Sequence, residues 1–411
     1  MKHSLWIACV VAILCSTALL AYLLPGDFAQ WVQGPAMWIT ASCVVFGVSY
    51  TVVATLLVRR FFSRPVVEST TFPAVTIVKP LHGAELALMQ NLVSFCEQDY
   101  PGPIQFLFGV HDSRDVALDV VRHVRGLFPD ADITVVSDAR LYGPNRKMSN
   151  VLNMLPEARH DILVFADSDV AVEQNYLRRV LGELHQPGVG VVTCLYWGKP
   201  DAGFWGSLSA DASNYQFLPG VVLGLASGMA RPCFGQTLAM RRATLEKIGG
   251  FSQFVHHLAE DHAIGEAVRL AGEKVVVPAF AVTHACAEKN AAEFVAHELR
   301  WSRTIRTIDP AGHLGSVLTH PLAFALLSVV VSGGAMWAWT TVGTAIIARL
   351  ALKLQMNKAL GRPAASIALL PIWDIVLFAV YLLSFVSSRV VWRGFNFTVG
   401  RDGLLVPVTE E

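Results

Sequence analysis

The sequence of 411 residues has few charged residues and no excess of either sign. Only 16% of the residues are Asp, Glu, Lys or Arg, whereas soluble proteins have about 25%. Hydrophobic residues make up 53%, which indicates a membrane protein. The 32 basic and 32 acidic residues cancel. Because a neutral chain has no overall field that attracts phosphate backbones, we expect no nucleic-acid partner.

The sequence also lacks paired cysteines. Its seven cysteines are scattered singly, without a CxxC pair or the ligand spacing of a zinc site. This pattern favours a reducing compartment. Three of the seven lie in apolar runs, where a thiol behaves as a small hydrophobic side chain, so we assign catalysis to none of them.

Two long apolar runs lie near the N-terminus, at residues 5–24 and 37–58. Each is long enough to cross a hydrocarbon core about 30 Å thick as a helix, so we predict a transmembrane hairpin. A cleavable signal peptide is the alternative for the first run, although no small-x-small cleavage site precedes a mature start. Arg59, Arg60 and Arg64 follow the second run and, by the positive-inside rule, predict that the next segment is cytoplasmic.

A second apolar region begins near Pro321 and continues to about Leu352, with a break at two glycines, and another run covers residues 365–386. The stretch IIARLALKLQMNKALGR lies between these runs and separates into two faces at helical spacing. The predicted faces are an apolar one of Ile347, Leu350 and Leu354 and a basic one of Lys353, Lys358 and Arg362. This pattern is typical of a helix in the membrane interface, and a loop helix packed on protein is the alternative.

Residues 73–320 alternate short β-branched runs with amphipathic helical patterns. The predicted strands are AVTIVKPL, QFLFGV, DITVVSD, DILVFADSD and VGVVTCLY. Strands that alternate with helices predict an α/β fold with a Rossmann-like, mostly parallel sheet covered on both faces. Ligands of such sheets bind beyond the carboxyl ends of the strands, so polar residues that follow the strands are the first candidates for chemistry.

Two predicted strands end in acidic residues. QFLFGV is followed by His111-Asp112, and DILVFA is followed by Asp167-Ser168-Asp169. Two carboxylates in one loop can hold Mg²⁺ or Mn²⁺ while the metal holds a diphosphate. A solvated turn with an Asx hydrogen bond is the alternative for such a tripeptide, but its position at a strand end favours the metal site.

A third acidic pair, Glu260-Asp261, begins the helical pattern of LAEDHAIGEAVRLAG. One interpretation is that these carboxylates cap a helix N-terminus and complement its dipole. The other is that one of them is a general base. The pattern leaves both open.

Further along the chain, HELRWSRTIR places Arg300, Arg303 and Arg306 at i, i+3 spacing, with Trp301 beside the first of them. A basic surface stripe is one interpretation. Guanidinium groups also clamp phosphates, and an indole provides a flat apolar wall for an acceptor. We therefore keep this segment as a candidate part of the site.

Taken in order, Asp112, the DSD tripeptide, Glu260-Asp261 and Arg300-Trp301 resemble the D, DxD, D, (Q/R)xxRW series of inverting family-2-like glycosyltransferases. From about residue 73 to the C-terminus, KPLHGAE, GPNRKMSNVLNMLP, VTCLY, AEDHAIGEAV and WRGFNFTVGRDG resemble ceramide glucosyltransferases (families 2 and 21). This resemblance implies a GT-A catalytic domain between N- and C-terminal transmembrane helices.

A narrower resemblance is to the bacterial branch associated with hopanoid biosynthesis, which adds N-acetylglucosamine to a polyhydroxylated hopanoid such as bacteriohopanetetrol. It rests on SFCEQDYPGP, NRKMSNVLNMLPEARHDILV, RPCFGQTLAMRR and HELRWSRTIR. His297 stands where the family pattern usually has Gln or Arg. An imidazole can donate to an oxyanion, but its charge near neutral pH is not fixed by the sequence.

The resemblance implies a role for each acidic residue. Asp112 would bind the uracil or ribose of a UDP-sugar, and Lys147 would approach the nucleotide. Asp167 and Asp169 would hold the sugar diphosphate through Mg²⁺ or Mn²⁺, with Asp169 as the direct ligand. Asp261 would take the proton of the acceptor hydroxyl.

The helical motif would complete the reaction. Arg300 would stabilise charge on the leaving UDP, and Trp301 would line the acceptor site. We expect N-acetylglucosamine transfer to a hopanoid hydroxyl, with glucose transfer to ceramide as the alternative.

These expectations give four parts of the chain. They are an N-terminal transmembrane hairpin (1–60), a cytoplasmic GT-A domain (61–312), a C-terminal membrane region with an interfacial helix (313–390) and a cytoplasmic tail (391–411). The expected location is the bacterial inner membrane, with several spans and the catalytic domain in the cytoplasm. The expected partners are a UDP-sugar, a lipid acceptor and the bilayer.

Three other functions share some of these features. A processive polysaccharide synthase needs a pore of several transmembrane helices, and the C-terminal apolar sequence is short for that. A polyprenyl-phosphate sugar transferase also pairs this fold with a lipid acceptor, and a product labile to mild acid would identify it. A non-catalytic membrane scaffold that retains the fold is the third.

Overall fold

The computed structural model describes residues 27–83, 85–362, 366–386, 389–392, 395–400 and 403–407. The predicted first span, residues 5–24, lies outside them. The chain forms two compact units. The helical unit contains Met1–Phe61, Asp211–Ser227 and Asn290–Asn396, and the α/β unit contains Phe62–Ala210, Gly228–Lys289 and Phe397–Glu411.

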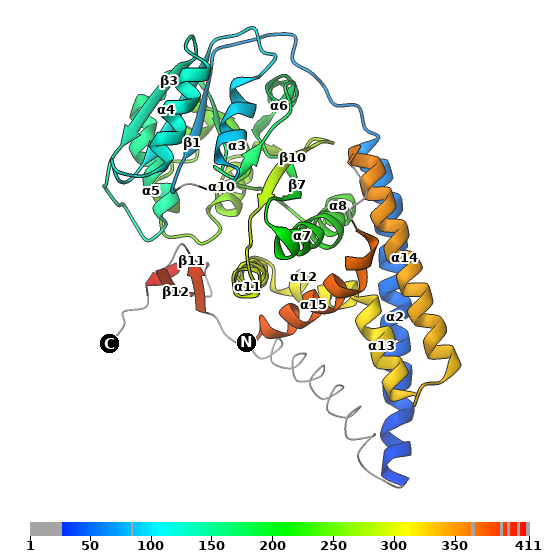
Figure 1. Ribbon diagram of the computed structural model, residues 1–411. Coiled ribbons are helices and arrows are strands. Elements are labelled where there is room, and N and C mark those ends of the chain that lie inside the picture. The colour runs from blue at the N-terminus through cyan, green and yellow to red at the C-terminus, as the bar shows by residue number, and fades with distance from the viewer. Residues whose placement is uncertain are drawn as a thin grey trace. The chain divides into compact units, whose positions relative to one another are not determined.

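The α/β unit contains a seven-stranded sheet in the order β3-β2-β1-β4-β8-β6-β9 (Figure 1). Its strands are β1 (Val75–Pro80), β2 (Ile104–Val110), β3 (Asp132–Ser137), β4 (Ile162–Phe165), β6 (Val189–Val192), β8 (Leu238–Arg241) and β9 (Lys274–Val276). The first four strands run parallel, and β8 is antiparallel to both β4 and β6. The predicted mostly parallel sheet is therefore confirmed.

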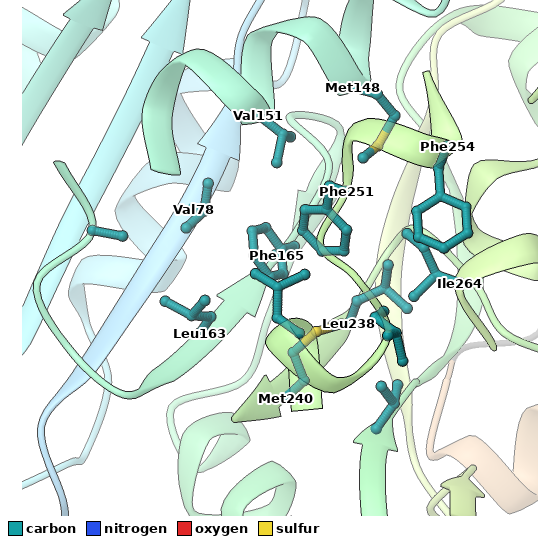
Figure 2. Close-up of a cluster of buried hydrophobic side chains, with 14 of the residues drawn as sticks. Val78, Met148, Val151, Leu163, Phe165, Leu238, Met240, Phe251, Phe254 and Ile264 are labelled. Carbon is teal, nitrogen blue, oxygen red and sulfur yellow. The ribbon is translucent and has the colours of Figure 1, made fainter. Parts of the chain in front are cut away.

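Helices connect these strands. They are α3 (Leu88–Cys96), α4 (Ala117–Leu127), α5 (Arg146–Met154), α6 (Tyr176–Leu184), α9 (Arg242–Lys247) and α10 (Glu260–Leu270). All six residues of β1 are buried, as expected for a central strand covered on both faces. Figure 2 shows a core cluster in which Phe165 of β4 lies beside Phe251, with Met148 and Val151 of α5 and Ile264 of α10 in the same cluster. This packing fixes α5 and α10 beside the end of β4.

The run VGVVTCLY is not one strand, as the alternation predicted, but two strands in different sheets. It forms β6 and then β7 (Leu195–Pro200), which pairs with β10 (Ala281–Cys286) in a small sheet with β5 (Val170–Ala171). Thr193 lies at the break, where its hydroxyl accepts from the Phe234 N–H at 2.8 Å and donates to the Phe234 carbonyl at 3.1 Å. A long-range contact of this kind leaves no trace in local periodicity.

The helical unit contains α2 (Asp27–Phe62), which includes the predicted second span. The other elements of the C-terminal part are α11 (Ala291–Ile308), α12 (Pro310–Gly315), η4 (Ser316–Thr319), α13 (Pro321–Val331), α14 (Met336–Leu360), η5 (Ile367–Leu369) and α15 (Leu370–Leu383). Gly333 and Gly334 have φ of 64° and 85° and form the turn between α13 and α14. Val44 of α2 packs against buried side chains of α13 and α14.

The segments Gly203–Ala212 (α7), Ser213–Phe217 (η2) and Leu218–Ser227 (α8) follow β7. The sequence patterns did not identify these helices. Tyr215 of η2 donates a hydrogen bond to Asn357 of α14 at 2.7 Å, which ties this insertion to the helical unit.

By length and composition, one helix of the described part could cross a membrane, at Gln33–Phe62. Pro310–Thr319 and Pro321–Val331 pass the same test only as a pair, and they are bent by 59°. The apolar helix Ile367–Leu383 is shorter.

The segment predicted as an interfacial helix is helical, and of its predicted basic face Lys358 is exposed whereas Lys353 is buried, so its place in the membrane interface stays a prediction. It is the second half of the continuous helix α14, and its apolar residues Ile347 and Leu354 are 69% and 49% exposed. Lys353 is buried and lies 3.1 Å from the Asp211 carboxylate, and the buried Arg349 is paired with Asp374. Charged groups with an internal partner face inward here, so the apolar side chains face outward.

Three short strands end the described chain: β11 (Arg389–Trp392), β12 (Phe395–Val399) and β13 (Leu405–Pro407). The last two form an antiparallel hairpin in which Val399 pairs with Leu405. Gly403, with φ of 79°, forms the turn. This hairpin lies in the predicted tail.

Candidate active site

The DSD loop, residues 167–169, follows β4 at the carboxyl end of the parallel strands. From the neighbouring strand β1, the buried Lys79 donates hydrogen bonds to the backbone carbonyls of Asp167 (2.8 Å) and Val170 (3.5 Å). Burial lowers the pKa of Lys79 to about 7, and the two loop aspartates oppose that shift. Lys79 therefore fixes the backbone of the DSD loop, and the sequence patterns did not single out this residue.

Lys147 brings two acidic segments together. Its Nζ lies 2.6 Å from Oδ1 of Asp167 and 2.9 Å from Oε1 of Glu260. Burial works against the charge of Lys147, but these two carboxylates outweigh it and raise its pKa. Burial raises the pKa of Asp167, and the positive charge of Lys147 partly offsets this rise. Three ionisable groups from α5, α10 and the DSD loop thus share one partly buried charge network.

Asn145 explains how Lys147 is positioned. Its side chain caps α5 by accepting the Met148 N–H at 3.0 Å. Its amide nitrogen donates to Glu260 and to the His257 carbonyl, each at 3.0 Å. One buried side chain therefore links the start of α5 with the segment that leads into α10.

Asp261 lies in the first turn of α10. Its Oδ2 accepts the Gly235 N–H at 2.9 Å, and its Oδ1 accepts the His262 N–H at 2.7 Å. The N-cap of α10 is Ala259, without a side-chain cap bond, so neither acid caps the helix, whereas both lie in its first turn, where they complement the dipole. Burial raises the pKa of Asp261 to about 7, and Glu260 adds to the rise. A carboxyl that titrates near neutral pH is suited to accepting a proton from a hydroxyl.

Gly235 is a second residue that sequence reasoning missed. A Cβ at this position would lie 2.7 Å from Nζ of Lys147, 3.3 Å from Asp167 and 3.6 Å from Asp261. The absence of a side chain therefore lets three functional groups meet round one backbone position. The run RPCFGQTLAMRR carries no local signal for this close approach.

Asp169 has a different environment from Asp167. Its Oδ1 lies 3.5 Å from Nδ1 of the buried His284 on β10. Burial alone would raise the pKa of Asp169, but the imidazole outweighs it and the pKa is lowered. Within the residues that the structure describes, this oxygen receives no hydrogen bond. His284 lies in the run AVTHAC, whose pattern carries no signal for a contact with the DSD loop.

The DSD loop fits a divalent cation bound together with a diphosphate. Asp167 and Asp169 supply hard oxygens, and one of them is a buried oxygen without a hydrogen bond. No cluster of three or more His, Cys, Asp or Glu that could hold a metal occurs in the described part of the chain. Mg²⁺ is typically held by one or two carboxylates plus substrate phosphates and waters, so two protein carboxylates are sufficient.

Asp112 lies after β2, as predicted, but on the surface. Its carboxylate accepts the Arg114 N–H at 2.9 Å and forms an ion pair with the same arginine at 3.3 Å. These bonds lower the pKa of Asp112. An ionised carboxylate at this strand end suits ribose or uracil binding, which stays a prediction.

Arg300, Trp301 and His297 share helix α11 of the helical unit. Trp301 is half-buried, and its ring packs edge-on against His297 (5.0 Å between centroids) and Phe217 (5.6 Å). The helix and its i, i+3 arginines are as expected. The roles of these three residues stay predictions.

The profile of the family described as glycosyl transferase family 21 matches residues 39–405. Ceramide glucosyltransferase 1 of Caenorhabditis elegans is 24% identical over 255 residues, which cover 60% of this chain and 53% of the relative. The ceramide glucosyltransferase of Candida albicans is 29% identical over 118 residues, 26% of this chain and 22% of the relative. The chain therefore spans about half the length, or less, of these curated relatives.

Among solved structures, a mannosyltransferase from Pyrobaculum calidifontis in complex with GDP-Man and Mn²⁺ is similar, with a TM-score of 0.51 and 19% identity. The match covers 85% of this chain and 97% of that chain. At this identity the likeness establishes the fold, which is GT-A as the resemblance implied. Because the family profile covers most of the sequence, this chain belongs to glycosyl transferase family 21.

Proposed function

We propose that this protein transfers a sugar from a UDP-sugar to a hydroxyl of a membrane lipid, with inversion at the anomeric carbon. The observation that carries the proposal is the charge network of Lys147. This lysine contacts the DSD loop through Asp167 and the start of α10 through Glu260, beside Asp261. A candidate diphosphate site and a candidate general base therefore share one lysine.

On the donor side, Asp169 and Asp167 hold Mg²⁺ or Mn²⁺, and Asp112 binds the uracil or ribose. A cation held there by these carboxylates would supply positive charge for the leaving diphosphate. Lys147 adds a further positive charge next to Asp167. Arg300 stabilises the departing UDP, and His297 is a second donor on the same helix.

On the acceptor side, Asp261 takes the proton of the lipid hydroxyl. The hydroxyl oxygen forms a bond to the anomeric carbon while the bond to the UDP oxygen breaks. UDP leaves with the electron pair of that bond. A single displacement from the opposite face inverts the configuration. Trp301 lines the acceptor site, where an amphipathic ring suits a lipid at the headgroup level.

The bilayer is the proposed surroundings of the helical unit. Helix α2 exposes large apolar side chains, such as Trp38 (78%) and Phe46 (62%), and α14 exposes Ile347. Arg59 and Arg60 in the last turn of α2 support a cytoplasmic catalytic domain by the positive-inside rule. The bacterial inner membrane, several spans and the division at residues 60, 312 and 390 remain part of this proposal.

Two acceptors have specific support. The sequence runs close to the hopanoid branch favour N-acetylglucosamine transfer to a polyhydroxylated hopanoid. The curated relatives are named ceramide glucosyltransferases, which favours glucose transfer to ceramide. We place the hopanoid first because SFCEQDYPGP, NRKMSNVLNMLPEARHDILV, RPCFGQTLAMRR and HELRWSRTIR resemble that branch most closely.

The deciding experiment is mass spectrometry of lipids from cells with and without the gene, together with UDP release by membranes given UDP-N-acetylglucosamine or UDP-glucose. We expect one glycolipid to disappear with the gene, and its masses identify both sugar and acceptor. A mild-acid-labile product would indicate a polyprenyl-phosphate sugar transferase. The absence of UDP release with every UDP-sugar would indicate a non-catalytic scaffold.

A further inference from the structure

The C-terminal segment pairs with the chain immediately before α10. The Leu405 N–H donates to the His256 carbonyl at 2.7 Å, and the Leu258 N–H donates to the Gly403 carbonyl at 3.0 Å. Between these bonds, Leu404 and His257 form an antiparallel bridge. The side chain of Leu405 is only 3% exposed. Residues 403–405, here called the tail strand, thus add a short strand to residues 256–258.

The tail strand is held in register from its other side. Gly400 donates to the Leu404 carbonyl at 2.9 Å, and Gly403 donates to the Gly400 carbonyl at 3.1 Å. Val399 then pairs with Leu405 in the β12–β13 hairpin. The positive φ of Gly403 permits this turn, which directs its carbonyl toward Leu258. The tail strand is therefore a defined hairpin edge.

Residues 256–258 need such support, because the helix that follows has no side-chain cap. The N-cap of α10 is Ala259, and no side-chain hydrogen bond is formed there. Glu260 and Asp261 come next, in the first turn. The position of Asp261 consequently depends on the backbone that leads into the helix, which the tail strand holds by two hydrogen bonds.

The same segment also positions Lys147. The His257 carbonyl accepts from the Asn145 side chain at 3.0 Å, and the Val255 carbonyl accepts the Asn145 N–H at 2.9 Å. Asn145 caps α5, whose first turn carries Lys147. A displacement of residues 255–258 would therefore move the lysine and the candidate base together.

We propose that the tail strand is a positioning element of the active site: by pairing with residues 256–258, it fixes Asp261 and Lys147 relative to the DSD loop. This inference rests on the proposed function. The tail strand touches no substrate and acts only through these backbone contacts. Because it follows α15 in the sequence, the catalytic site is complete only when the chain after the helical unit has folded back onto the α/β unit.

The test compares Leu405→Pro with Leu405→Ala in the full-length protein. Proline removes the N–H that His256 accepts, whereas alanine removes packing but retains that N–H. We expect Leu405→Pro to lower kcat by about 10- to 100-fold, since a misplacement of about 1 Å can have that effect. Its KM for the UDP-sugar should change far less, and Leu405→Ala should retain most of the rate.

Hydrogen exchange separates this proposal from the proposed function. The Leu258 amide and the first turn of α10 should exchange faster in Leu405→Pro than in Leu405→Ala, whether or not the protein transfers sugar. Unchanged exchange, or an equal loss of rate in both variants, would overturn the positioning role. Faster exchange in a protein that shows no transfer with any donor would instead overturn the proposed function.

Discussion

Lys147 and Asp167 form a partly buried ion pair with 2.6 Å between Nζ and Oδ1, and the same Nζ lies 2.9 Å from Glu260. The lysine thus neutralises carboxylates from two segments that are 93 residues apart in the numbering, at positions 167 and 260. A cation bound at Asp167 would compete with Lys147 for the negative charge of that carboxylate.

Replacement of Lys147 by methionine should destabilise the protein. Removing one partner of a fully buried ion pair typically costs about 3–5 kcal/mol, and the loss here should be smaller because the side chains of Lys147 and Asp167 are 17% and 24% exposed. We expect a lower thermal midpoint, partly restored by Mn²⁺, since a cation at Asp167 replaces the lost charge. Thermal unfolding in detergent with Mn²⁺ or EDTA measures this. The control is Lys147→Arg, which keeps the charge, and an unchanged midpoint in Lys147→Met would contradict the prediction.

The activity should rise with pH up to about 7. The pKa of Asp261 is raised to about 7, so the proton-accepting form becomes populated as the pH increases through that value. A raised pKa stabilises the folded protein below the unfolded value of about 3.9, and that contribution is lost as the pH rises through 7. The pH profile of kcat/KM and thermal unfolding between pH 5 and 8 test the two effects.

The variant Asp261→Asn should abolish transfer while UDP-sugar binding stays nearly intact. A general base acts on the acceptor in the transition state and adds little to donor affinity. It should also remove the part of the pH-dependent stability that Asp261 contributes. Titration calorimetry with the UDP-sugar and a rate assay give both quantities. A fall in donor affinity proportional to the rate would assign Asp261 to the donor site.

The variant Gly235→Ala should lose activity and part of the stability that the Lys147 ion pairs provide. The new Cβ would lie 2.7 Å from Lys147 Nζ, so the end of this flexible side chain has to move away. Moving it separates the lysine from its carboxylates, so we expect a loss of about tenfold or more. Gly126→Ala is the control, since a Cβ there meets no atom within 4 Å. Equal activity in the two variants would show that the lysine tolerates the displacement.

The variants Asp167→Asn and Asp169→Asn should each lose most activity through weaker binding of the metal and diphosphate. An amide keeps the shape of the side chain but removes the charge that attracts a divalent cation. Asp138→Asn is a matched control, because Asp138 also follows a strand but pairs with the surface Arg140. Activity assays with EDTA and added Mn²⁺ measure the effect. Full activity in EDTA would exclude the metal-dependent mechanism.

The pair Arg349 and Asp374 should show strong coupling. Both side chains are buried, so Asp374→Leu alone leaves an unpaired guanidinium and should cost about 3–5 kcal/mol. The double variant Arg349→Met with Asp374→Leu should recover most of this loss, because an apolar pair needs no partner. A double-mutant cycle by thermal unfolding measures the coupling. Additive effects of the two substitutions would argue against a direct interaction.

Local patterns in the sequence determined much of the catalytic domain. Alternation of β-branched runs with amphipathic stretches is a local property, and it correctly predicted β1 to β4 with the helices between them. The same patterns put Asp112 and the DSD loop at strand ends and Glu260-Asp261 at a helix start. The long apolar run of α2 was also predicted correctly, because the length of a hydrophobic run can be counted along the sequence.

Only the tertiary structure decided which groups face one another. The contacts of Lys147 with Asp167 and Glu260, of Gly235 with Asp261, and of the tail strand with residues 256–258 join segments distant in the sequence. Periodicity carries no information about such pairs. In α14 the helical period was visible in the sequence, but the buried partner of Lys353 was not. A helix with two faces turns its charges outward in water and inward where they find buried partners, as Lys353 does with Asp211.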